Sequence, residues 1–323
     1  MKYGERAPQS GKTKIANRLA AQPASLAGRL AGAKDVRLVF FGTENFSAPT
    51  LSALIGQGWP ILAVVTKPNA KQGRGQKLAV PPVKKIALRA GLRVFQPGKV
   101  ADIEADLAKL RPTHGVLVAY GQIIPDSILK LFRGGIINLH PSLLPKYRGP
   151  SPIEAAILNG DKQTGLSLMR LTAGMDEGPV YYQSVLKLKG SENRLELSKK
   201  MAKMGADRLI ERLPQIIDGR LKPVPQDNSK ATYTPLLKKE DGAVNFSQPA
   251  EVIERQIRAY LGWPRSRATI FGKEVVITKA SLVKDRTTGL VIQCNPGLLQ
   301  IEELIAPSGR TISGVEFIRG YSL

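Results

Sequence analysis

The chain has 323 residues, of which 42% are hydrophobic and 23% charged, as in ordinary globular proteins. It contains no apolar run near the roughly 18 residues of a membrane-spanning helix. One cysteine, Cys294, excludes an internal disulfide, and one cysteine with two histidines cannot form a Cys/His zinc cluster. At roughly 100 to 200 residues per domain, the length predicts about two domains.

The formal charge is +22, from 48 basic and 26 acidic residues. An excess of this size favours a polyanionic partner, and nucleic acid ahead of a membrane surface. The alternative is that the basic surface only aids solubility, and charge alone does not separate the two interpretations.

The first segment, residues 1–35, is predicted to be a basic flexible tail. Glu5 is the only carboxylate before Asp35, against seven basic residues. Apolar residues from Ile15 to Leu30 would line one side of a helix, as in an organelle transit peptide, but Pro23 interrupts them. We therefore expect a bacterial cytoplasmic protein, with a mitochondrial or plastid matrix as the alternative.

Strands and helices alternate through residues 36–217. Buried strands are expected at 36–41, 61–65, 114–119, up to His140 and at 164–171, and helices at 48–55, 82–90, 103–110 and 195–213. This order predicts a doubly wound, mostly parallel α/β sheet of Rossmann type, covered on both faces. Such sheets bind ligands at the carboxyl ends of their strands.

A cationic segment follows the second expected strand. Between Lys67 and Lys99 there are nine basic residues and no acidic one, and residues 69–77 are rich in glycine. We interpret this part as a mobile loop. The pair Gly73 and Gly75 lacks the third glycine of a dinucleotide fingerprint, since Leu78 takes its place. Contact with phosphates or an RNA backbone is one hypothesis, and an exposed solvated loop is the other.

Residues 218–230 are polar and contain two prolines, which predicts a linker. The remainder, 231–323, shows a helix at 250–259 and short strands at 268–271, 275–278, 290–293 and 298–301, typical of a small antiparallel OB-like barrel. The stretch 281–297 predicts fewer strands than a full five-stranded barrel has. With 12 basic and 9 acidic residues, this domain carries little of the charge and would only assist RNA binding.

Two polar residues end the strand that stops at His140. Asn138 and His140 lie on one face of it, while Ile137 and Leu139 point to the other. An amide donor beside an imidazole suits acyl transfer, because the amide stabilises an oxyanion and the imidazole moves protons. Asp176, in the glycine-flanked turn 174–178, would orient the ring and favour its charged form if it reaches it. A structural histidine and a turn-forming aspartate are the alternatives.

These motifs resemble the folate-dependent formyltransferases, and among them those that act on methionyl-tRNA. The resemblance covers residues 36–323 and rests on these segments: Phe41–Thr43, Gly73–Leu78, Ala119–Pro125, Asn138–Pro145, Arg148–Gly149, Gly174–Gly178 and Arg258–Pro264.

The resemblance implies a reaction and its partners. The formyl group of 10-formyltetrahydrofolate would pass to the amino group of methionyl initiator tRNA, giving N-formylmethionyl-tRNA for translation initiation. No metal and no membrane partner are implied, and a monomer is expected. The implied site residues are catalytic Asn138, His140 and Asp176, folate-binding Ser142, Leu143, Leu144 and Pro145, and tRNA-binding Arg74, Lys71 and Lys77.

Two other functions compete with this one. An amino-sugar formyltransferase or a formyl-folate hydrolase would use the same Asn/His/Asp site, but neither needs an acid-free glycine and arginine loop together with a barrel. A catalytically silent RNA-binding protein would use the basic face and the barrel. The presence of Asn138, His140 and Asp176 together argues against it.

Overall fold

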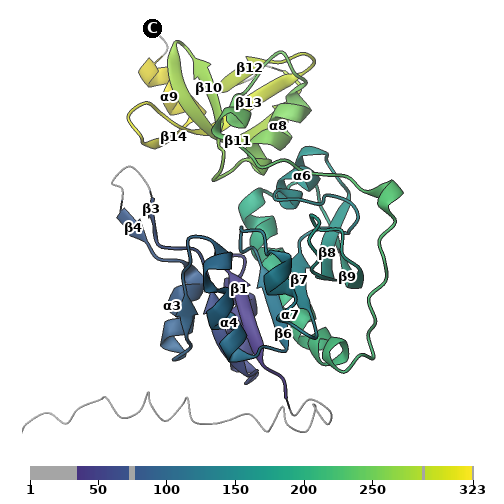
Figure 1. The fold of residues 1–323 in the computed structure, drawn as a ribbon. Helices are drawn as coiled ribbons and strands as arrows, with labels where there is room; N and C mark the ends of the chain where they lie inside the picture. The colour runs from purple at the N-terminus through teal and green to yellow at the C-terminus, as the bar shows by residue number, and fades with distance from the viewer. Residues whose placement is uncertain (1–34, 73–76, 286–287, 322–323) are drawn as a thin grey trace, which may run out of the picture.

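The computed structural model describes residues 35–72, 77–285 and 288–321. Figure 1 shows an α/β part and a smaller β-rich part, joined by the green stretch that follows α7 and runs along the flank of the α/β part. Among the described residues, no helix is both long and apolar enough to span a bilayer.

The α/β part is built on a seven-stranded sheet of order β5-β2-β1-β6-β7-β8-β9. Its strands are β1 Leu38–Gly42, β2 Ile61–Val65, β5 Val94–Phe95, β6 His114–Val118, β7 Ile136–His140, β8 Gln163–Arg170 and β9 Val180–Lys187. The first five in sheet order are mutually parallel, whereas β8 and β9 are antiparallel to their neighbours. The predicted mostly parallel sheet is confirmed. Strands β5 and β9 were not predicted from the sequence.

Helices cover both faces of this sheet, because its strands alternate. Leu38 and Phe40 pack in one apolar cluster and Val39 and Phe41 in another, on the opposite face. The first cluster includes residues of α2 Ala48–Gly56, α3 Pro82–Arg89, α6 Pro152–Leu158 and α7 Arg194–Ile217, and the second those of α4 Glu104–Leu110 and α5 Asp126–Leu129. The sheet is therefore doubly wound, as predicted.

The cationic segment differs from its prediction as a simple loop. Its two ends form an antiparallel hairpin of β3 Ala70–Gln72 and β4 Lys77–Ala79, which projects from the rest of the α/β part in Figure 1. Arg74 lies outside the described residues, as do the side chains of Lys71 and Lys77.

The second part is an antiparallel sheet of five strands, of order β10-β11-β13-β12 with β14 on β13. Its elements are α8 Ala250–Ala259, β10 Ser266–Ile270, β11 Lys273–Val283, β12 Leu290–Gln293, β13 Leu298–Ile305, β14 Thr311–Ser313 and α9 Gly314–Tyr321. The expected shortage of strands is wrong, because three-residue β14 leaves no hydrophobic pattern in the sequence. No pairing among the described residues joins β10 to β12, so the sheet is a half-barrel.

The two parts meet through α8. Arg255 Nε donates to the carbonyl oxygen of Leu158 at 2.9 Å, and Arg258 Nη1 donates to that of Glu192 at 2.8 Å. Ala259 and Tyr260 are buried in the core of the α/β part. The described residues also form three short 3-10 helices: η2 Val100–Ile103, η3 Asn228–Lys230 and η4 Lys239–Gly242.

Candidate active site

The last residues of β7 place two polar side chains at the carboxyl edge of the sheet. Ile137 and Leu139 point into the cluster that contains α7, so the alternation of the strand turns Asn138 and His140 to the other face. Both are buried, with 6% and 5% exposure. The sequence predicted this shared face correctly.

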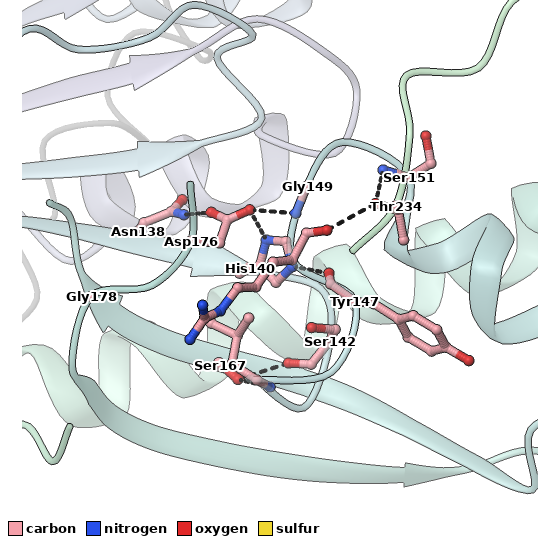
Figure 2. A network of polar contacts seen from close by, with 12 residues as sticks. Asn138, His140, Ser142, Tyr147, Gly149, Ser151, Ser167, Asp176, Gly178 and Thr234 are labelled. Carbon is pink, nitrogen blue, oxygen red and sulfur yellow. Dashed lines mark hydrogen bonds and ion pairs between the residues drawn. The ribbon is translucent and has the colours of Figure 1, made fainter. Parts of the chain in front are cut away.

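Asp176 reaches both of these side chains from the loop that joins β8 to β9. Its Oδ1 accepts a hydrogen bond from Asn138 Nδ2 at 3.3 Å, and its Oδ2 lies 3.5 Å from His140 Nδ1. Oδ2 also accepts the backbone N–H of Gly149 at 2.8 Å. Figure 2 shows the carboxylate between the amide, the ring and this backbone group. The structure therefore brings the three predicted residues together.

A second contact of His140 determines which ring nitrogen carries its proton. His140 Nε2 lies 2.8 Å from the carbonyl oxygen of Tyr147. A carbonyl oxygen can only accept, so Nε2 carries a hydrogen and donates it. The atom whose protonation can change is then Nδ1, which faces Asp176. Burial raises the pKa of the Tyr147 hydroxyl above its usual range.

The backbone of residues 147–149 is shaped to make these contacts. Tyr147 has φ +60° and Gly149 has φ +107°, both in the left-handed region. A Cβ on Gly149 would lie 2.5 Å from the carbonyl oxygen of Thr234. Only glycine fits this close approach, and its N–H then points at Asp176. The sequence showed an Arg148–Gly149 motif, but it indicated no role for the carbonyl group of Tyr147 or the N–H of Gly149.

The predicted folate segment, residues 142–145, begins two residues after His140, and several of its polar groups form hydrogen bonds within the protein. Ser142 Oγ donates to the carbonyl oxygen of Lys146 at 2.5 Å. Ser167 Oγ accepts the N–H of Leu144 at 3.0 Å and donates to the carbonyl oxygen of Ser142 at 2.7 Å. Leu143 and Pro145 are half-buried. No contact shown here tests folate binding, which stays a prediction for all four residues.

A cavity of about 920 Å³ opens at the carboxyl ends of β1 and β2. Its walls come from the loop after β1, the segment after β2, the stems of the β3–β4 hairpin, and the first turns of α3 and α7. Among the lining residues that the structure describes there are four cations, Lys67, Lys85, Arg194 and Lys199, and a single carboxylate, Glu44. The sequence predicted a site at this edge but not the contribution of α7.

This cavity borders β6, the strand that separates it from Asn138, His140 and Asp176. Thr43 Oγ1 donates to the carbonyl oxygen of Tyr120 at 2.9 Å, just beyond β6. A Cβ on Gly121 would lie 2.5 Å from Lys67 Nζ, so the ammonium group packs against this backbone. The cavity and these three residues therefore share one edge of the sheet, although none of the three lines the cavity itself.

Comparison with known families gives two matches that together span most of the chain. The sequence model of the family described as "Formyl transferase" matches residues 36–213, and that of "Formyl transferase, C-terminal domain" matches residues 236–322.

Curated relatives match over nearly their whole length. A methionyl-tRNA formyltransferase of Geobacter metallireducens is 36% identical over 298 residues, covering 88% of this chain and 96% of that protein. One of Roseiflexus castenholzii is 39% identical over 304 residues, covering 90% and 97% respectively.

Solved structures share the fold at lower identity. HypX from Aquifex aeolicus in complex with tetrahydrofolic acid has a TM-score of 0.61 and 16% identity, over 88% of this chain and 47% of that chain. An N-formyltransferase from Helicobacter canadensis, in complex with folinic acid and dTDP-3-aminofucose, has a TM-score of 0.63 and 18% identity, over 87% and 96%.

Proposed function

The chain belongs to the formyl transferase family, and from this we infer the reaction that its active site catalyses. It transfers the formyl group of 10-formyltetrahydrofolate to the amino group of methionyl initiator tRNA, giving N-formylmethionyl-tRNA for translation initiation. The observation that carries the chemistry is the meeting of an amide, an imidazole and a carboxylate at the carboxyl edge of the sheet. The residue roles below are our proposal.

Asn138 and His140 are proposed to act on the transferred formyl group. The methionine amine attacks the formyl carbon, a C–N bond forms, and the formyl oxygen takes up the negative charge. One N–H of Asn138 Nδ2 is directed to Asp176, which leaves the second for this oxyanion. Protonated Nδ1 of His140 supplies a further donor. Burial of both side chains strengthens such bonds, because little water competes for them.

Proton transfer is proposed to run through the same ring nitrogen. When the tetrahedral intermediate collapses, the bond from carbon to the folate N10 breaks, and N10 takes a proton from His140 Nδ1. The attacking amine loses a proton, which restores the charged ring. Asp176 Oδ2, at 3.5 Å, stabilises the charged state of the ring without becoming protonated itself. Nε2 takes no part, because it is bound to Tyr147.

The acceptor end of the tRNA is proposed to enter from the cavity of 920 Å³. Its cationic lining matches a polyanion, and the hairpin that carries Lys71, Arg74 and Lys77 forms one of its walls. We propose that these three residues bind the tRNA. The half-barrel carries little net charge, so we propose that it only assists in tRNA binding.

Further proposals concern the folate and the organisation of the protein. Residues 142–145 are proposed to line the folate site, as the family resemblance implies; they begin two residues after His140. We retain as proposals the division into 1–35, 36–217, 218–230 and 231–323, a monomeric state, and a cytoplasmic location.

The reaction is tested by acid-gel electrophoresis of charged initiator methionyl-tRNA, incubated with the protein with and without 10-formyltetrahydrofolate. A folate-dependent shift to the formylated species is expected. His140→Ala should abolish the shift while folate binding, measured by calorimetry, persists. Absence of the shift with intact folate binding would contradict the acceptor and favour an amino-sugar acceptor, whereas formate release without any acceptor would indicate a hydrolase.

A further inference from the structure

The loop that carries Asp176 is held by a side chain from the segment connecting the two parts. Gln226 Nε2 donates to two backbone carbonyl oxygens of this loop, that of Asp176 at 2.8 Å and that of Gly178 at 2.7 Å. Gln226 belongs to the segment between α7 and α8, and the stretch that follows α7 runs along the flank of the α/β part in Figure 1. A residue distant in sequence thus contacts the backbone of a proposed catalytic residue.

The other end of the same amide is held by a buried cation. Gln226 Oε1 accepts hydrogen bonds from Arg148 Nε at 3.1 Å and from Arg148 Nη2 at 2.9 Å. Arg148 is only 1% exposed, and it has no carboxylate partner among the described residues. It cannot lose its proton, so its N–H groups need acceptors. Asn228 Oδ1 accepts from Nη2 at 2.7 Å, and Tyr233 Oη accepts from Nη1 at 3.1 Å.

These contacts fix the orientation of the Gln226 amide. A guanidinium only donates and a carbonyl only accepts, so the oxygen of the amide must face Arg148 and its nitrogen must face the loop. Both hydrogens and both lone pairs of the amide are used. A flipped amide would lose all four bonds.

The loop has an uncommon backbone conformation at Asp176. This residue has φ +50°, in the left-handed region that few residues other than glycine, asparagine and aspartate adopt. Within reach of its carboxylate are Asn138, His140 and the N–H of Gly149, each of which contacts it only while the loop keeps this conformation. A small displacement of the loop would therefore move the carboxylate away from the ring.

We propose that Gln226, oriented by Arg148, is a positioning residue that holds the Asp176 loop in its active conformation. It acts through Asp176 and does not touch the reacting atoms. The connecting segment then does more than join the two parts, because it completes the support of the active site. This inference rests on the proposed role of Asp176.

Two substitutions separate positioning of the loop from anchoring of the segment. Gln226→Glu keeps the oxygen that faces Arg148 and adds an ion pair with it. The NH₂ group that donates to the loop is replaced by an oxygen, which repels the carbonyl oxygens of the loop. Gln226→Met has a side chain of similar length but loses the bonds to Arg148 as well as those to the loop. We expect both variants to lower kcat by about 10- to 100-fold, the scale of a misplacement of about 1 Å. The KM for 10-formyltetrahydrofolate should change by less than about threefold.

Asn228→Ala is the matched control, since Asn228, in the same segment, accepts a hydrogen bond from Arg148, whereas the side-chain donor to the loop carbonyls is Gln226. Its kcat should stay within about twofold of the wild type. If Gln226→Glu retains the wild-type kcat, the amide only anchors the segment and the proposal is wrong. The same conclusion follows if Gln226→Met loses only thermal stability.

Nuclear magnetic resonance separates this inference from the proposed function. The chain has only two histidines, His114 and His140, so the ring Cε1–H signals are few and are assigned with His114→Gln. Both Gln226 variants should move the His140 signal and leave that of His114 in place. If the variants shift the His140 signal but the wild-type protein does not formylate methionyl-tRNA, the positioning role of Gln226 is supported and methionyl-tRNA is rejected as the acceptor. An unmoved signal would reject positioning, whatever the acceptor.

Discussion

The Nε2 atom of His140 lies 2.8 Å from the backbone carbonyl oxygen of Tyr147, and this contact gives the two ring nitrogens different tasks. Because Nε2 donates to a backbone group, substitution of the Tyr147 side chain does not remove its acceptor. Nδ1 is left to face Asp176 Oδ2 at 3.5 Å, a distance at which the charge of the carboxylate matters more than a strong hydrogen bond. The ring is thus oriented by the backbone and supported electrostatically by the carboxylate.

Asp176→Asn should therefore lower kcat while the ring keeps its place. The amide can still accept the N–H of Gly149, but its NH₂ group then faces the Nδ2 donor of Asn138, and the negative charge beside Nδ1 is lost. We expect kcat to fall by at least about 100-fold, with a much smaller change in the KM for folate. Steady-state kinetics with Asp227→Asn, an exposed carboxylate of the connecting segment, provides the control. Unchanged turnover in Asp176→Asn would show that the charge is not needed.

Gly149→Ala should reduce both stability and activity. The new Cβ would lie 2.5 Å from the carbonyl oxygen of Thr234, at a φ of +107° that alanine rarely adopts. The free energy of unfolding should fall by about 2 to 4 kcal/mol in urea denaturation, and kcat should fall because the donor to Asp176 moves. Gly272→Ala is the comparison, with φ +68° and open space around the Cβ. In Gly272→Ala the free energy of unfolding should fall by only about 1 kcal/mol, and kcat should not change.

Arg74→Ala should weaken the use of tRNA far more than the use of folate. Removal of one cation from the loop of the β3–β4 hairpin removes a phosphate or stacking contact with the acceptor end. We expect the KM for methionyl-tRNA to rise by about 10-fold and its dependence on salt to become shallower, with the KM for folate unchanged. Arg89→Ala, an exposed arginine on α3 outside the cavity lining, should have little effect. An equal loss for both substrates would contradict a tRNA role for Arg74.

His114 should make the protein less stable in mild acid. Burial, together with the nearby positive charge of Arg133, lowers its pKa from 6.5 to about 4. Between these values the unfolded chain binds more protons at this residue than the folded protein does. The free energy of unfolding therefore decreases as the pH falls from 6.5 towards 4. Urea midpoints at pH 7 and pH 5 should differ less in His114→Gln than in the wild type, and an equal difference in both would show that His114 does not contribute.

The alternation of strands and helices was predictable because its signals are local. The apolar run 61–65 shows a buried strand directly, and β2 has these bounds, while β7 ends at His140 as expected. Strand β9 was missed because none of its residues is fully buried, so it lacks the continuous apolar run of a central strand. The open half-barrel could not be predicted either, since closure depends on pairing between strands distant in sequence.

The sequence by itself determined which groups are available for the chemistry. It placed Asn138 and His140 on one face of a strand, because side chains alternate along any strand, and it marked Asp176 by its glycine-flanked turn. Only the tertiary structure decided how these groups act. The acceptor of His140 Nε2, the N–H that Gly149 gives to Asp176 and the amide of Gln226 beneath the Asp176 loop come from other turns and from the connecting segment. Backbone groups and long-range contacts leave no residue pattern in the chain, because their positions follow from how the whole molecule packs.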